Sequence, residues 1–169
     1  MENSHTDRIG ILSDLLTRAG YSMATAESCT GGMIAAMCTD IAGSSAWFMG
    51  GVVSYANEIK ESLLGVPPAV LETHGAVSGE VVRHMAAGAL HVCGAQAAVA
   101  VSGIAGPGGG TPEKPVGTAW FALAVRDGRM KLRRSLYPRR SRREVQLCAT
   151  RTALDLLLCG LRASYDVNL

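Results

Sequence analysis

The sequence lacks the patterns that identify several common classes of protein. Acidic residues (Glu2, Asp7) precede any apolar stretch, so we predict no signal peptide and a cytoplasmic location. The five cysteines show no CxxC spacing and fit a reducing compartment, and the four histidines show no HExxH pattern. We therefore predict no metal site and no cofactor. No repeat or linker divides the chain, which predicts one domain over residues 1–169.

Charge is also sparse, because only 18% of the residues are charged while 48% are hydrophobic and 20 are glycine. This composition predicts compact, buried elements joined by tight turns, and it excludes a disordered chain. The uncharged window from His84 to Pro112 is long enough to consider as a membrane span. His91, Gln96 and several glycines interrupt it, so we interpret it as protein interior, made of a helix, a turn and a strand.

Helical and strand periodicities alternate along the chain. We predict helices over residues 9–19 and 30–39, from residue 58 with Asn57 as its cap, and over 67–75, 79–92 and 141–161. We predict strands over residues 23–26, 51–55, 97–102, 117–125 and 130–137, the last two joined by a hairpin at Asp127-Gly128. The pattern predicts an α/β fold, a three-layer sandwich whose mostly parallel, mixed sheet is covered by helices on both faces.

In such a sheet a ligand binds beyond the carboxyl ends of the strands. Ser28, Tyr55 and Ser102 each come at or just after a predicted strand, so we expect them to meet there. The glycine-rich loop that starts at Gly103 would join them. It lacks the Gly-Lys-Ser/Thr ending of a P-loop and the GxGxxG spacing of a dinucleotide turn.

Two nucleophile candidates, Ser28 and Cys29, lie at the turn between a predicted strand and a predicted helix. Exposed backbone N–H groups at such a turn favour an oxyanion. The alternative is that Ser28 or Thr30 only caps the helix. A serine nucleophile needs a base, and a buried lysine with a lowered pKa is one possibility; Lys60, one turn into a helix after a strand, is the candidate, although a lysine there is more often solvated.

Five segments together resemble the CinA C-terminal-domain family in order and spacing. They are residues 26–32 (AESCTGG), 55–66 (with YANEIK and LGV), 75–78 (GAVS), 102–107 (SGIAGP) and 114–118 (KPVGT). The likeness spans nearly the whole chain. It implies a nicotinamide-nucleotide amidohydrolase, which converts nicotinamide mononucleotide and water to nicotinate mononucleotide and ammonia in pyridine nucleotide recycling.

The resemblance also implies roles for individual residues. It makes Ser28 the nucleophile and Lys60 its base, with Ser45 and Tyr55 in the same hydrogen-bonding cluster. The remaining residues that it implies bind the substrate: Thr30, Gly31 and Gly32 at the oxyanion, and Asn57, Ser102, Gly103, Gly106 and Arg142 around the nucleotide. Where family members carry Gly-Asp-Arg before the last helix, this chain has Arg140-Ser141-Arg142, so only Arg142 matches.

Two other functions remain open. Eight of the sixteen basic residues lie between Arg129 and Arg143, which would suit a competence- or recombination-associated binding module. No aromatic residues interleave there for base stacking, so we favour a solvated strand face and a phosphate-binding helix start over nucleic-acid binding. The second alternative is a related amidase with a changed substrate. As partners we expect a small-molecule nucleotide and a second copy in a dimer, and no membrane.

Overall fold

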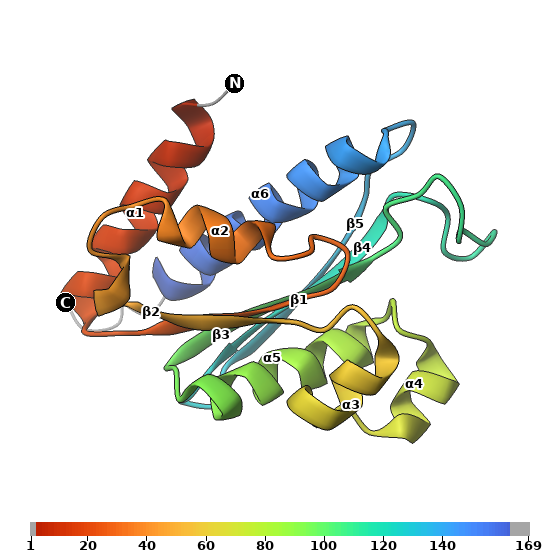
Figure 1. Cartoon of the computed structure of the whole chain (residues 1–169), viewed down its shortest axis with the longest axis horizontal. Coiled ribbons are helices and arrows are strands. Elements are labelled where there is room, and N and C mark those ends of the chain that lie inside the picture. Colours follow the sequence, from red (N-terminus) through yellow and green to blue (C-terminus); the bar gives the residue numbers. More distant parts are fainter. Residues whose placement is uncertain (1–2, 163–169) are drawn as a thin grey trace.

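A five-stranded mixed sheet forms the centre of the molecule (Figure 1). The structure, a computed structural model, describes residues 3–162. The strands lie in the order β2-β1-β3-β4-β5: β1 (Met23–Glu27), β2 (Phe48–Val53), β3 (Ala97–Gly103), β4 (Thr118–Val125) and β5 (Met130–Leu136). β1 pairs in parallel with β2 and β3, whereas β4 is antiparallel to both β3 and β5. The β4–β5 hairpin turns at Asp127-Gly128, as predicted.

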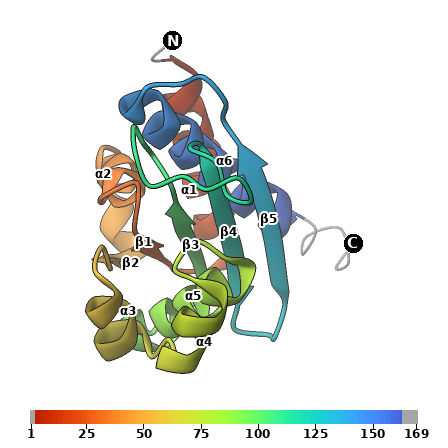
Figure 2. The ribbon, with the colours of Figure 1, turned by 90° about the vertical axis from the view of Figure 1, so that its right-hand side faces the viewer.

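Helices lie on both faces of the sheet (Figures 1 and 2). One face carries α1 (Asn3–Ala19), α2 (Met33–Thr39) and α6 (Arg142–Arg162), and the other carries α3 (Asn57–Leu64), α4 (Pro68–His74) and α5 (Gly79–Cys93). A short 3-10 helix, η1 (Ser44–Ala46), precedes β2. This arrangement confirms the predicted three-layer α/β sandwich.

The two faces of the sheet are packed differently. The face toward α1 and α6 buries large side chains such as Phe121, Leu123 and Leu157. The face toward α5 is made of small ones: Ala24, Ala26, Ala98, Ala100, Ala122 and Ala124. α5 in turn lies close to α3, because a Cβ added at Gly88 would be 2.1 Å from the carbonyl oxygen of Leu64. Only glycine permits this approach, which sets the place of the helix that carries Lys60.

Two helices begin differently from the prediction. Thr30, Gly31 and Gly32 form a turn before α2 instead of its first residues, because Gly31 and Gly32 have φ values of 61° and 94°, which are not helical. Asn57 is the first residue of α3, not its cap; Ala56 holds the N-cap position and makes no side-chain cap. α5 begins as predicted and is capped by Ser78, whose hydroxyl accepts the amide of Val81.

β2 begins and ends earlier than predicted. It runs over Phe48–Val53 instead of 51–55, so Ser54 and Tyr55 lie after the strand. They are therefore at the same edge of the sheet as Ser28, which follows β1. The prediction missed residues 48–50, which include Gly50, because glycine is depleted in strands.

The uncharged window of residues 84–112 holds the end of α5, all of β3 and the start of the following loop. β3 is buried except for its last residue, which is half-buried, but residues 91, 92, 94 and 107–112 are exposed, so the window is interior only in part. Among the helices of residues 3–162, none combines the length and the apolar character needed to cross a bilayer. The sheet has two edges, β2 and β5, and the expected dimer stays a prediction.

Candidate active site

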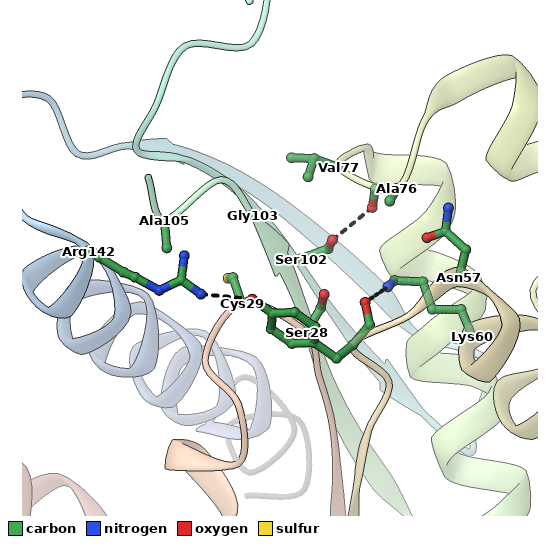
Figure 3. A pocket seen from close by; sticks show the side chains of 11 residues that line it. Ser28, Cys29, Asn57, Lys60, Ala76, Val77, Ser102, Gly103, Ala105 and Arg142 are labelled. Atoms are coloured by element: carbon green, nitrogen blue, oxygen red, sulfur yellow. Dashed lines mark hydrogen bonds between the residues drawn. The ribbon is translucent and has the colours of Figure 1, made fainter. Parts of the chain in front are cut away.

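A pocket of about 220 Å³ opens at the carboxyl ends of β1, β2 and β3 (Figure 3). Its lining comes from these strand ends, the start of α3, the loop before α5 and the start of α6: Ser28, Cys29, Tyr55, Asn57, Lys60, Ala76, Val77, Ser102, Gly103, Ala105 and Arg142. The structure thus brings together the serine, tyrosine and glycine-loop segments that the sequence placed at this edge.

Ser28 is held by the strands on either side of β1. Its amide donates to the carbonyl oxygen of Val101 in β3 at 3.0 Å. On the other side, the amide of Ser54 donates to the carbonyl oxygen of Glu27 at 2.8 Å. Ser28 lines the pocket although the residue is only 9% exposed. Its hydroxyl therefore faces the pocket from a backbone that is fixed on both sides.

The carboxylate of Glu27, fully buried, fills the space beneath the turn that follows Ser28. It accepts the hydroxyl of Thr30 at 2.7 Å and the amides of Gly32, Ile34 and Ala35 at 3.1, 3.1 and 2.8 Å. These donors satisfy a carboxylate that burial would otherwise penalise. The first amides of α2 are consequently engaged by the chain itself.

Thr30, Gly31 and Gly32, which we expect at an oxyanion, use three of their donors within the turn itself. The Thr30 hydroxyl and the Gly32 amide donate to Glu27, and the Gly31 amide donates to the carbonyl oxygen of Ser28 at 3.1 Å. All three lie outside the pocket lining. The Thr30 hydroxyl and the amides of Gly31 and Gly32 are therefore used to shape the turn.

Cys29 also lines the pocket, but its thiol is buried and only 4% of the residue is exposed. Burial raises the pKa of this thiol to about 12. Its Sγ packs against Gly103, where an added Cβ would approach it to 3.0 Å. Because the thiolate is the reactive form, a thiol held protonated in this way is a poor nucleophile. The close packing also explains why a glycine follows Ser102 at this position.

Lys60 is 1% exposed, which makes it one of the largest fully buried side chains. Its Nζ donates to the carbonyl oxygens of Ser54 at 2.8 Å and Tyr55 at 3.1 Å. Burial lowers the pKa of this lysine. Figure 3 shows the side chain reaching from α3 toward the part of the pocket where Ser28 lies. The lysine is therefore a buried amine, in contrast to the solvated helix residue that its type alone would suggest.

Arg142 joins three parts of the pocket wall. From the start of α6 its guanidinium donates to the carbonyl oxygen of Gly106 at 2.9 Å and to the hydroxyl of Tyr55 at 2.8 Å. Gly106 itself is not a lining residue, so its part here is to hold the arginine. Both acceptors are neutral, and within residues 3–162 no carboxylate pairs with this guanidinium.

The remaining predicted substrate residues lie on the side of α3 and α5. Ser102 is buried, and its hydroxyl donates to the carbonyl oxygen of Ala76 at 2.8 Å, which fixes the loop before α5 against β3. Asn57 is exposed and lines the pocket from the first turn of α3. Ser102 thus shapes the wall, while the Asn57 amide is open to a ligand.

Ser45 is not part of this cluster, and the expectation that it would be is wrong. It is exposed and lies in η1, before β2 begins. Phe48, the first residue of β2, pairs with Met23, the first residue of β1, so Ser45 is at the opposite end of the sheet from Ser28. Parallel strands place everything before β2 at the amino edge.

Most of the basic stretch lies away from the pocket. Lys131, Arg133 and Arg134 are exposed on the edge strand β5, which Figure 2 shows at one side of the sheet. Of the eight basic residues between Arg129 and Arg143, Arg142 is the one that lines the pocket. In the part of the chain that the structure describes, no group of three or more His, Cys, Asp or Glu side chains is placed to hold a metal ion.

Related proteins share the sequence of this chain over most of its length. The model of the CinA C-terminal domain matches residues 6–161. A protein of Enterobacter agglomerans named nicotinamide-nucleotide amidohydrolase PncC is 59% identical over 115 residues, 68% of this chain and 70% of that protein. A CinA-like protein of Mycobacterium marinum is 53% identical over 148 residues, 86% of this chain and 35% of that protein. The chain thus spans about a third of the length of such CinA-like relatives.

Solved structures share the fold as well. The competence/damage inducible protein CihA of Agrobacterium tumefaciens superposes with a TM-score of 0.89 at 45% identity, covering 94% of this chain and 95% of that one. A CinA superfamily protein of Klebsiella pneumoniae gives a TM-score of 0.89 at 35% identity, covering 94% and 98%. These findings confirm the resemblance that the motifs indicated.

Proposed function

The chain belongs to the CinA C-terminal domain family, and from that membership we propose that it is an amidohydrolase that converts nicotinamide mononucleotide and water to nicotinate mononucleotide and ammonia. The relative named as a nicotinamide-nucleotide amidohydrolase supports this choice of substrate. The observation that carries the proposal is a buried lysine with a lowered pKa lining the same pocket as a strand-end serine, Lys60 and Ser28. This pair has the composition that Ser-Lys hydrolases use.

The two carbonyl oxygens beside Lys60 suit a neutral amine. A neutral amine has two N–H bonds, and Ser54 and Tyr55 provide two acceptors. With both N–H bonds directed at these carbonyls, the lone pair must point elsewhere, and the open side of Lys60 is the pocket. The bend between β2 and α3 would thereby aim the base, and burial would favour its neutral form.

The proposed reaction then runs in two halves. Lys60 takes the hydroxyl proton of Ser28 while the serine Oγ forms a bond to the carboxamide carbon of the substrate. The carbon–nitrogen bond of the carboxamide then breaks, and Lys60 gives the same proton to the departing ammonia. Water next attacks the acyl ester and gives a proton to Lys60. That proton returns to the Oγ of Ser28 as the ester bond breaks and nicotinate mononucleotide is released.

Arg142 is the proposed contact for the phosphate of the substrate. Its guanidinium now binds only neutral acceptors, Tyr55 and Gly106, so an anion would be a stronger partner. The geometry of a guanidinium also suits two phosphate oxygens at once. Asn57, exposed on the opposite wall, is the proposed contact for another polar group of the nucleotide.

The direct test is to incubate the purified chain with nicotinamide mononucleotide and to measure ammonia and nicotinate mononucleotide. We expect equimolar products from the wild type and none from Ser28→Ala or Lys60→Ala. Nicotinamide riboside, which lacks the phosphate, is the control substrate and should react poorly. Turnover of the riboside but not of the mononucleotide would instead support the amidase with a changed substrate.

A second candidate function rests on the exposed basic residues of β5. Lys131, Arg133 and Arg134 are not used by the proposed reaction, and a basic edge suits an acidic partner such as a nucleic acid. Measuring DNA binding over a range of salt concentrations distinguishes the two functions. Tight binding with a steep salt dependence, lost in Arg133→Ala, together with no ammonia release, would favour this candidate.

A further inference from the structure

The carboxylate of Glu27 is buried next to the proposed nucleophile, yet it takes part in no proton transfer of the proposed reaction. We propose that Glu27 is a positioning residue that fixes the turn carrying Ser28, so that the serine hydroxyl points into the pocket. The inference rests on the proposed function, in which Ser28 attacks the substrate.

The contacts of Glu27 join β1 to the turn and to the start of α2. Its Oε2 accepts from the hydroxyl of Thr30 and the amides of Gly32 and Ile34, and its Oε1 accepts from the amide of Ala35 at 2.8 Å and the hydroxyl of Thr25 at 3.3 Å. The side chain is fully buried. Five donors on one buried carboxylate hold this segment more firmly than backbone bonds alone.

Ser28 lies inside the loop that these contacts close. The carboxylate of Glu27 accepts the hydroxyl of Thr30, and the amide of Gly31 donates to the carbonyl oxygen of Ser28. Without the carboxylate, the turn would keep its backbone bonds, from the Ser28 amide to β3 and from α2 to the carbonyl oxygens of Thr30 and Gly32. It would lose the side-chain link that ties the end of β1 to the start of α2. A displacement of about 1 Å at a reacting group can cost roughly 100-fold in rate.

The pattern of donors makes the requirement for a carboxylate specific. Three of the partners are backbone N–H groups, which can only donate. A glutamine would have to place its NH₂ group against Ala35 on one side or against Gly32 and Ile34 on the other. Either orientation loses at least one hydrogen bond and opposes donor to donor, although the shape of the side chain is unchanged.

Two variants, Glu27→Ala and Glu27→Gln, separate the charge from the shape. We expect Glu27→Ala to lower kcat for nicotinamide mononucleotide roughly 100-fold with KM nearly unchanged, because the substrate does not touch this residue. Added formate should restore at least part of that loss, since it can occupy the vacated space and accept the freed donors. Glu27→Gln should lower kcat less and should not respond to formate, because its side chain fills the space.

Thr152→Val is the matched control. Thr152 is a buried hydroxyl that accepts from Tyr137 at 2.6 Å, on the same side of the sheet but outside the pocket lining. Losing this bond should lower the midpoint of thermal unfolding and leave kcat unchanged, with no response to formate. A purely structural role for Glu27 would give the same result in its variants.

The proposal is therefore overturned if Glu27→Gln, assayed well below its unfolding midpoint, keeps kcat within about threefold of the wild type. It is also overturned if the loss appears in KM, or if formate raises the unfolding midpoint of Glu27→Ala without raising kcat. If Glu27→Ala does not fold, the kcat and KM of Glu27→Gln decide the matter.

Failure of the proposed function is recognised separately. If the wild type releases no ammonia, Ser28 is not the nucleophile of this reaction, and the role of Glu27 is judged by amide hydrogen exchange. Faster exchange across residues 28–35 in Glu27→Gln, but not in Thr152→Val, would show that the carboxylate fixes the turn. Unchanged exchange would remove the positioning role as well.

Discussion

Lys60 and Ser54 meet across the bend between β2 and α3, with the lysine Nζ 2.8 Å from the serine carbonyl oxygen. Within residues 3–162 Lys60 forms no ion pair, so its polar contacts are carbonyl oxygens, which accept a hydrogen bond from either form of the amine. Burial favours the neutral form. The negative charge of Glu58, and that of Cys29 at a pH where its thiol is ionised, oppose this effect less strongly.

The first prediction is a rise of kcat/KM with pH. Only the neutral amine of Lys60 can accept the Ser28 proton, so activity should increase as pH passes the pKa of this lysine, which burial lowers from the reference value of about 10.4. Lys60→Arg should be as inactive as Lys60→Ala, because a guanidinium stays charged. Steady-state kinetics over a pH series measures both. Substantial turnover in Lys60→Arg would mean that the base is another group.

The second prediction concerns stability at the same residue. Because the pKa of Lys60 is lowered in the folded state, the unfolded chain binds more protons between that pKa and about 10.4. The free energy of unfolding of the wild type should therefore rise with pH across this interval relative to Lys60→Met, which has no such proton. Urea unfolding at several pH values tests this; parallel curves for the two proteins would contradict it.

The third prediction separates the adjacent nucleophile candidates. Ser28→Ala should abolish turnover, whereas Cys29→Ala should keep most of it, because burial holds the Cys29 thiol protonated. Mass spectrometry after iodoacetamide should find the exposed Cys159 alkylated long before Cys29. Inactivation in step with alkylation of Cys29 would mean that Cys29, and not Ser28, is the nucleophile.

The fourth prediction assigns a binding role to Arg142. Arg142→Ala should raise KM for nicotinamide mononucleotide roughly 10- to 100-fold, the effect of losing hydrogen bonds to a charged group, and should change kcat far less. Arg143→Ala is the matched control, since that side chain lies next in sequence but outside the pocket lining. Equal effects of the two variants on KM would point to general electrostatic attraction instead.

The fifth prediction is that activity survives EDTA. The proposed reaction draws its nucleophile and base from Ser28 and Lys60, so it needs no metal-bound water. The enzyme should be assayed after dialysis against the chelator, with zinc or manganese added back to a parallel sample. Loss of turnover that either metal restores would refute the serine–lysine reaction.

Much of the site follows from the sequence for a geometric reason. The carboxyl ends of neighbouring parallel strands meet at one edge, so Ser28, Tyr55 and Ser102 could be placed together once their strands were recognised. The same argument does not place Ser45, because the edge of the sheet at which Ser45 lies depends on the residue where β2 begins. With that strand starting at Phe48, the serine falls before it, at the other edge.

The role of the turn after β1 was harder to predict. Gly31 and Gly32 resemble an anion-binding turn in sequence, and nothing local shows that their donors are already engaged. One signal was present in the sequence: Glu27 directly follows the predicted strand of residues 23–26, and a carboxylate that is buried there must find several donors nearby. The nearest donors are the hydroxyl and amides of the turn itself, which a comparison of sequence motifs assumes to be available to a ligand.

The contact between Gly88 and Leu64 means that the width of the pocket depends on residues that do not line it. α3 brings Lys60 to the pocket, and its distance from α5 is set by a glycine facing a carbonyl oxygen. A methyl group there, or on one of the alanines beneath α5, would push a whole helix outward and Lys60 with it. Selection for a larger or smaller substrate could therefore act through alanine and glycine positions that no ligand ever touches.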